Sequence, residues 1–153
     1  MKKLCLLIVF HALLLNVFAQ DSMDKVTEKR AREMHRVIGL SDKEQWKKFI
    51  KENYTQALID KPMTAKIETS ERDDAEPSTK VSSANNLEEK AKMFQQLHND
   101  FGNSKILSIK PDGEKLEMIL QNKESLKGTF QLRFEKKSPY LIDGLGIEVL
   151  HSH

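Results

Sequence analysis

The sequence predicts an α+β fold in which helices pack on one face of a curved, four-stranded antiparallel sheet. The first observation is a stretch of helical periodicity that ends at Gly102. Its apolar positions are Leu87, Ala91, Phe94, Leu97 and Phe101. The second observation is the alternation of apolar and polar residues between positions 106 and 149. Because helices and strands occur in separate runs, we expect the helices to cover one side of the sheet.

The first 19 residues have the pattern of a secretory signal peptide. Lys2 and Lys3 form a positively charged start, residues 4–15 are almost wholly apolar, and Ala19 stands where a signal peptidase would cut. The apolar run is interrupted by His11. It is therefore shorter than the roughly 20 apolar residues of a membrane-spanning helix. We predict a secreted or periplasmic protein, cleaved near Ala19 and without a stable membrane anchor.

Cleavage changes the chemistry that the chain can offer. Cys5 is the only cysteine, so the mature chain has no thiol for a disulfide, a nucleophile or a thiolate metal site. Lys2 and Lys3 account for the whole formal net charge of +2 of the 153-residue chain. The mature chain is then neutral. Phosphate binding needs a clear basic excess, so the sequence argues against a nucleic-acid partner.

Residues 20–59 are predicted to form an N-terminal helical pair. The first helix runs from Asp24 to Ile38 and ends at Gly39. Ser41 and Glu44 have the spacing of a capping box, which would start a second helix at residues 42–58. The apolar positions of that second helix are Trp46, Phe49, Ile50, Tyr54, Ala57 and Leu58.

Residues 60–85 are predicted to be a polar loop or insert. They lack apolar periodicity and are rich in Thr, Ser, Glu, Asp and Lys, with prolines at Pro62 and Pro77. A segment of this length is either a lid over a binding face or a disordered insert. A short strand from Ala65 to Thr69 is a further alternative.

Residues 86–150 are predicted to form a helix followed by an antiparallel meander, and residues 20–150 to form one domain. Asn86 is expected to cap the helix, with Glu89 three residues later completing a capping box. Gly102 is expected to end the helix in the left-handed conformation.

Alternation predicts the four strands. Residues 106–110 form the first, and Pro111-Asp112-Gly113 the turn after it. The second and third strands direct one set of apolar side chains to one face: Leu116, Met118, Leu120, Phe130, Leu132 and Phe134. The last strand, Tyr140 to Val149, has Gly144 and Gly146 on the opposite face, where missing side chains permit a bend or a close approach. Consecutive hairpins of this kind form a sheet with one buried face.

Three segments resemble a known group of proteins. They are the helix end Leu97-His98-Asn99-Asp100-Phe101-Gly102, the closing strand Pro139-Tyr140-Leu141-Ile142-Asp143-Gly144-Leu145-Gly146-Ile147, and the upstream segment Phe49-Ile50-Lys51-Glu52-Asn53-Tyr54. Together they resemble the small cystatin-like or NTF2-like modules of secreted bacterial proteins. The resemblance implies a curved, cone-shaped sheet wrapped around a helix, in a protein from the Bacteroidetes. In that group the modules often lie beside beta-lactamase-type serine hydrolases or peptidases.

The sequence departs from those fused proteins in one respect. No hydrolase domain follows Val149 and there is no Ser-x-x-Lys motif. We therefore expect the catalytic half to be missing and transfer no catalytic residue from it.

His98 and Asp100 are the first candidates for acid–base chemistry, with His35, Tyr54 and Asp143 as partners across the mouth of a cone. NTF2-like isomerases and dehydratases use such an arrangement. The alternative is that His98 packs at the helix end and Asp100 is solvated, because residues two apart on a helix do not share a face.

The histidines do not indicate a metal site. His35, His98, His151 and His153 have no spacing typical of metal ligands. We predict no metal and no cofactor.

Two functions remain open from the sequence. The preferred one is a noncatalytic module that binds an extracytoplasmic protein, such as a hydrolase, or a small ligand. The binding surface would be the concave sheet face around Met118 and Phe130, or the edge at Gly144 and Gly146. The alternative is a small NTF2-like enzyme of the isomerase, dehydratase or hydrolase type. A filled concave face would remove its pocket, whereas a cavity lined by His98, Asp143 or Tyr54 would favour it.

Overall fold

The computed structural model describes residues 23–62 and 83–150 of the chain. The predicted signal peptide, most of the polar insert and its alternative strand lie outside the described residues. Residues 23–38 are helical and form the N-terminal helix. The later helices are α2 (Lys43–Asn53), α3 (Gln56–Asp60) and α4 (Ser83–Phe101). The strands are β1 (Lys105–Asp112), β2 (Lys115–Gln121), β3 (Lys127–Phe134) and β4 (Ile142–Leu150).

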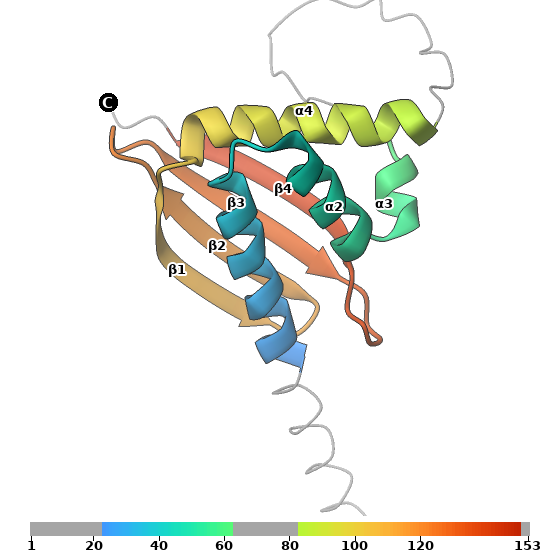
Figure 1. Cartoon of the computed structure of the whole chain (residues 1–153). Coiled ribbons are helices and arrows are strands. Elements are labelled where there is room, and N and C mark those ends of the chain that lie inside the picture. The colour runs from blue at the N-terminus through green and yellow to red at the C-terminus, as the bar shows by residue number, and fades with distance from the viewer. Residues whose placement is uncertain (1–22, 63–82, 151–153) are drawn as a thin grey trace, which may run out of the picture.

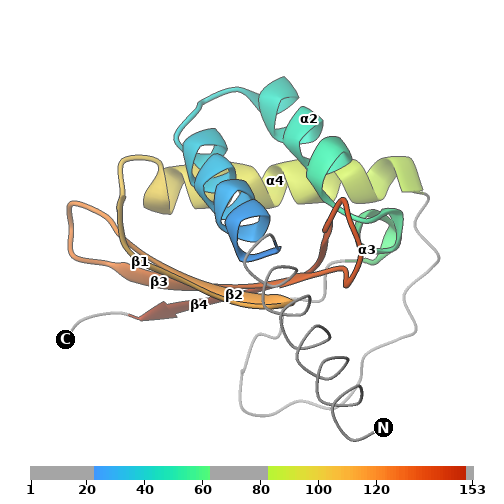
Figure 2. The ribbon, with the colours of Figure 1, turned by 90° about the horizontal axis from the view of Figure 1, so that it is seen from below.

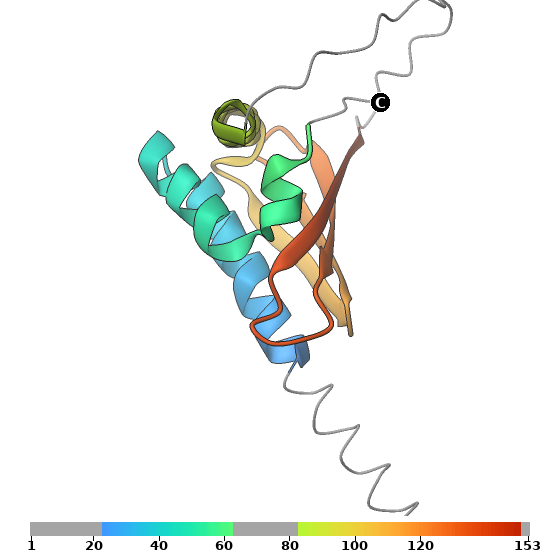
Figure 3. The ribbon, with the colours of Figure 1, turned by 90° about the vertical axis from the view of Figure 1, so that its right-hand side faces the viewer.

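The strands form one open antiparallel sheet in the order β1-β2-β3-β4 (Figure 1). The helices lie on one side of it, as the views in Figure 2 and Figure 3 show. This arrangement confirms the predicted α+β class and the four-stranded antiparallel sheet. We call the helix-covered side the inner face and the opposite side the outer face. Among residues 23–62 and 83–150, no helix has both the length and the apolar character needed to cross a membrane.

The inner face is filled by the hydrophobic core. The alternating apolar side chains of β2 and β3 are at most 2% exposed: Leu116, Met118, Leu120, Phe130, Leu132 and Phe134. Phe94 and Phe101 from α4 are fully buried against this cluster. The ring of Phe94 lies 5.8 Å from that of Phe49 in α2, and the ring of Phe101 meets Phe130 edge-on at 5.6 Å. The predicted ligand candidates Met118 and Phe130 are thus core residues at 0% exposure.

The second predicted helix is wrong in its length, because the chain breaks it in two. Tyr54 leaves α2 in the extended conformation, and the Thr55 side chain caps α3 by accepting from the Leu58 N–H. The Thr55 N–H donates to the Ile142 carbonyl at 2.8 Å, and Tyr54 forms a parallel bridge with Ile142. Pairing with the start of β4 therefore replaces helical hydrogen bonds that the local sequence would allow.

Three predicted helix ends are also wrong. The cap of α2 is Asp42 and not Ser41: its carboxylate accepts from the Glu44 N–H at 2.9 Å. Asn86 does not cap α4, which begins at Ser83; its buried amide donates to the Asp60 carbonyl at 2.7 Å. Among the described glycines only Gly113 has a positive φ, so Gly102 does not end α4 in the left-handed conformation. Gly102 is needed for space instead, because a Cβ there would lie 2.5 Å from the His98 carbonyl oxygen.

The strand boundaries differ from the predicted ones by a few residues. β1 continues through Pro111 to Asp112, which pairs with Lys115, so the turn comprises only Gly113 and Glu114. Gly113 adopts φ +59°, which suits a two-residue hairpin. β4 begins at Ile142, because Tyr140 adopts φ +55° and cannot continue a strand.

Ion pairs fasten α2 to α4. The Glu88 carboxylate lies 2.6 Å from Lys43 Nζ and 2.5 Å from Lys47 Nζ. Hydrogen bonds from these two ammonium groups lower the pKa of Glu88 to about 2. The pairing joins helices that are far apart in the sequence, so it contributes to tertiary stability.

Replacing Glu88 with glutamine is expected to make the stability of the protein depend less on pH under acidic conditions. A lowered carboxyl pKa stabilises the fold fully above the unfolded value of 4.5, and this contribution disappears as the pH falls towards about 2. The thermal midpoint of the native protein should therefore fall more between pH 5 and pH 2 than that of Glu88→Gln. Thermal unfolding at low salt, followed by circular dichroism, checks this. Parallel pH curves for the two proteins would contradict it.

Candidate functional site

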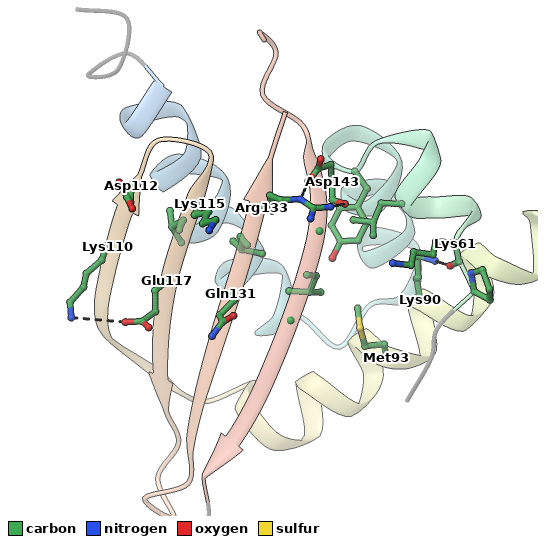
Figure 4. Close-up of a pocket in the computed structure, with 18 residues that line it drawn as sticks. Lys61, Lys90, Met93, Lys110, Asp112, Lys115, Glu117, Gln131, Arg133 and Asp143 are labelled. Carbon is green, nitrogen blue, oxygen red and sulfur yellow. Dashed lines mark hydrogen bonds and ion pairs between the residues drawn. The ribbon is translucent and has the colours of Figure 1, made fainter. Parts of the chain in front are cut away.

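A hollow of about 850 Å³ lies along β4, and we call it the β4 hollow. It extends from the outer face of the sheet past the edge of β4 to the sides of α3 and α4 (Figure 4). Its outer part is lined by polar side chains from β1, β2 and β3: Lys110, Asp112, Lys115, Glu117, Gln131 and Arg133. Its inner part is lined mainly by apolar side chains: Tyr54, Leu58, Met93 and Leu145. The hollow is therefore charged on one side of β4 and largely apolar on the other.

Arg133 dominates the outer part next to β4. Its Nε lies 2.6 Å from an Asp143 carboxylate oxygen, and this hydrogen bond raises the pKa of Arg133. A Cβ at Gly144 would lie 3.2 Å from the Arg133 Cβ and 3.4 Å from its Cζ. The glycine thus leaves room for the arginine side chain to lie across β4. The close approach expected at Gly144 is present, whereas a Cβ at Gly146 would meet only ordinary contacts, at 3.8 Å from the Gln131 Cβ.

Tyr54 lies where the hollow turns to its apolar side. The residue is 3% exposed, and its buried phenol oxygen has no hydrogen-bond partner among residues 23–62 and 83–150. Burial raises the pKa of this phenol, so it stays protonated at neutral pH. This enclosed, neutral hydroxyl therefore carries a desolvation cost in the folded protein.

Lys90 forms the end of the apolar part. Its Nζ donates to the Ile59 carbonyl at 2.9 Å and to the Lys61 carbonyl at 2.7 Å. Burial lowers the pKa of Lys90. The ammonium group satisfies carbonyls at the end of α3, as cations commonly do at helix C-termini. Lys90 therefore holds α3 against α4 and shapes one wall of the hollow.

Lys90 and Arg133 are among the residues of the hollow that the sequence did not indicate as site residues. Lys90 occurs within the apolar stripe of α4, three residues after Leu87 and four before Phe94, and that position was the available signal. Arg133 pairs directly with Gly144 across the sheet. The alternation placed both on the same face, but it did not show that the arginine side chain covers the glycine.

The acid–base candidates are not brought together. His98 Nδ1 donates to the Ile38 carbonyl at 2.9 Å, and the ring lies beside Trp46 with a centroid distance of 6.0 Å. Asp100 is exposed at the end of α4, and neither residue lines the hollow. His35 Nε2 lies 3.1 Å from the Ser104 carbonyl oxygen. These histidines connect the N-terminal helix to the end of α4 and to the segment that follows it.

Four predicted site residues do share the hollow: Tyr54, Asp143, Gly144 and Gly146. Within the described ranges, 23–62 and 83–150, no group of three or more His, Cys, Asp or Glu residues is placed to hold a metal ion. His151 and His153 lie outside these ranges.

Fold and site together define a small α+β domain with a filled inner face and a hollow at one sheet edge. Comparison of the chain with protein-family models, with curated proteins and with solved structures gave no match. The β4 hollow is therefore the feature of this protein that points to a function.

Replacing Tyr54 with phenylalanine should leave the free energy of unfolding unchanged or raise it by about 1 kcal/mol. Removing a buried hydroxyl without a partner removes its desolvation cost and no hydrogen bond. Urea unfolding of both proteins measures the difference. Tyr54→Leu serves as a control, because it removes the ring contact with Phe49 at 6.1 Å and should destabilise the fold. A loss of more than about 1 kcal/mol in Tyr54→Phe would reveal a hydrogen bond of the phenol.

Proposed function

We propose that this protein is a secreted, noncatalytic binding module and that the β4 hollow is its binding site. One observation carries the proposal. The inner sheet face, one of the two predicted binding surfaces, is filled by core side chains, whereas the Gly144–Gly146 edge opens into a hollow of about 850 Å³. Sites that bind ligands are typically concave and mostly apolar, with a few polar groups that fix orientation. An extracytoplasmic protein, for example a hydrolase, is the expected partner class.

The hollow supports binding better than catalysis. Its titratable candidates from the sequence are Tyr54 and Asp143. The Asp143 carboxylate is engaged by Arg133 at 2.6 Å, and the raised pKa of Tyr54 opposes proton loss. His98 is hydrogen-bonded elsewhere. The acid–base residues expected from the sequence thus offer the NTF2-like enzyme alternative no carboxylate or imidazole in the hollow that is free to take a proton.

A blocking variant tests the site. Gly146→Tyr places a ring on the outer side of β4, where an added Cβ meets no close neighbour. Tyrosine favours strands, so this change should preserve the fold. Thr129→Tyr is the matched control, because Thr129 lies on the same face of β3 but does not line the hollow.

The experiment is a pull-down from the extracytoplasmic fraction under mild conditions with the native protein and both variants. The native protein and Thr129→Tyr should capture the same partner, and Gly146→Tyr should lose it. Capture of nothing by the native protein, or equal capture by all three, would overturn the proposal. Circular dichroism establishes that each variant is folded.

A further inference from the structure

The two edges of the sheet differ in how they are protected against pairing. Native proteins protect edge strands with lysine, proline, bulges or covering segments, because an exposed edge presents unpaired N–H and C=O groups. β1 has Lys105, Lys110, Pro111 and a register shift between Ile106 and Ser108. β4 contains no lysine, arginine or proline, and its register shift lies only at its first residue. Within the described part of the chain, the β1 edge therefore has these protective features, whereas β4 has only the charged residues Asp143 and Glu148.

β4 also permits close approach along most of its length. Among the described residues, only Tyr54 bridges its open edge, and it does so at Ile142. From there on, Gly144 and Gly146 have no side chain that would hinder a neighbouring backbone. Val149 is 38% exposed, although it lies on the same face as the core. The open edge of β4 thus presents unpaired backbone N–H and C=O groups together with apolar surface to an added strand.

The two sides of the β4 hollow would receive alternate side chains of an added strand. Neighbouring strands place their side chains in register on each face, with a period of two residues. Side chains directed inward would lie beside Leu145, towards Leu58 and Met93, and are expected to be apolar.

Side chains directed outward would meet the Arg133 guanidinium and the Asp143 carboxylate that it binds. The Arg133 guanidinium lies over Gly144 and its side chain is 60% exposed. Lys115 lines the hollow on the neighbouring strand and pairs with Arg133 in register. An acidic side chain opposite Gly144 would approach this guanidinium, which binds Asp143 through Nε and Nη2 and can donate further hydrogen bonds.

We propose that the occupant of the β4 hollow is an extended segment of a partner protein that pairs with β4 as a fifth strand and alternates apolar with acidic side chains. The inference rests on the proposed function and names the partner chemistry for the same site. Main-chain hydrogen bonds to the strand edge supply affinity in this mode of recognition, and the alternate side chains supply specificity. The other occupant that the edge could accept, a second copy of this chain, is an outcome of the test.

The test uses a synthetic peptide of about seven residues, the length of a typical strand, in which valine and glutamate alternate. Binding is measured by fluorescence anisotropy, and amide hydrogen exchange reports on residues 143–149. The peptide should bind and protect the amides of β4. Three control peptides should bind weakly or not at all: one with backbone N-methylation, one with lysine in place of glutamate, and one with valines and glutamates in separate blocks.

Variants of the protein locate the contacts. Arg133→Gln should weaken peptide binding by at least about two- to fivefold, because it removes an exposed ion pair with the peptide. The change also leaves the Asp143 carboxylate without its arginine partner, next to the glutamates of the peptide. Lys127→Gln should leave it unchanged, because Lys127 belongs to the same strand and face but does not line the hollow.

Three results would overturn the inference: no binding of the alternating peptide, equal binding of the N-methylated peptide, or a free protein that is a dimer with the β4 amides already protected. If the peptide fails but Gly146→Tyr still abolishes partner capture, the proposed binding site stands and only the strand-addition mode is wrong. If Gly146→Tyr has no effect on capture, the site itself is wrong.

Discussion

Replacing Phe94 with alanine is expected to lower the free energy of unfolding by about 3–5 kcal/mol, the usual cost of deleting a fully buried phenylalanine ring. Phe94 is 0% exposed at the centre of α4, and its ring packs against that of Phe49. The other phenylalanine of α4, Phe101, packs against Phe130 instead, so it does not occupy this space. Urea unfolding with a common slope for both proteins measures the loss.

The neighbouring Gln95 supplies the control for Phe94. It is exposed on the other side of α4, so Gln95→Ala should change the free energy of unfolding by no more than about 0.5 kcal/mol. A loss below about 2 kcal/mol in Phe94→Ala would show that α4 is not the centre of the core.

Replacing Gly128 with alanine should destabilise the protein by about 1–3 kcal/mol, although alanine is the better residue in a strand interior. An added Cβ would lie 2.5 Å from Cζ and 2.9 Å from Cε1 of Phe101. That ring cannot move aside freely, because it meets Phe130 edge-on at 5.6 Å. The free-energy cost of the clash should therefore exceed the stabilisation that comes from replacing a glycine in a strand. Thermal and urea unfolding measure the net effect.

Two further variants show whether the Phe101 ring causes this loss. Gly146→Ala makes the same change on β4, where the new Cβ has its nearest contact at 3.8 Å, and should be neutral or stabilising by about 0.5–1 kcal/mol. Phe101→Leu replaces the ring with which the new Cβ of Gly128→Ala would clash by a shorter side chain. The double variant Gly128→Ala/Phe101→Leu should therefore lose less stability than the sum of the two single losses. Additive losses, or equal effects of alanine at both glycines, would contradict the assignment of the clash.

Local periodicity was sufficient to predict the α+β class and most of the strands. The spacing from Leu87 to Phe101 identified the buried side of α4, and the alternation through Met118 and Phe130 identified the inner face of the sheet. These patterns are reliable because each reflects one side of one element facing one core. The same logic placed Gly144 and Gly146 on the face opposite Leu145 and Ile147.

Errors arose where a distant segment competes for the backbone or the side chain. Tyr54 fits the helical pattern, but the adjacent Thr55 N–H pairs with the Ile142 carbonyl, which is far away in the sequence. Asn86 has the side chain of a cap, yet it binds the carbonyl of Asp60. Neither partner can be identified from nearby residues, because both depend on how α3 and β4 pack.

The candidate site likewise has features that the sequence indicates and features that only tertiary packing determines. The sequence was enough to select Tyr54, Asp143, Gly144 and Gly146, since unusual side chains at a strand and a helix end are visible in it. Only the folded chain decides that these four residues share one hollow, whereas His98 and Asp100 lie apart from it. It also decides that Phe101 requires a glycine at position 128. Side-chain patterns report which face a residue occupies, but a cavity and a clash both depend on distances between elements, which only tertiary packing sets.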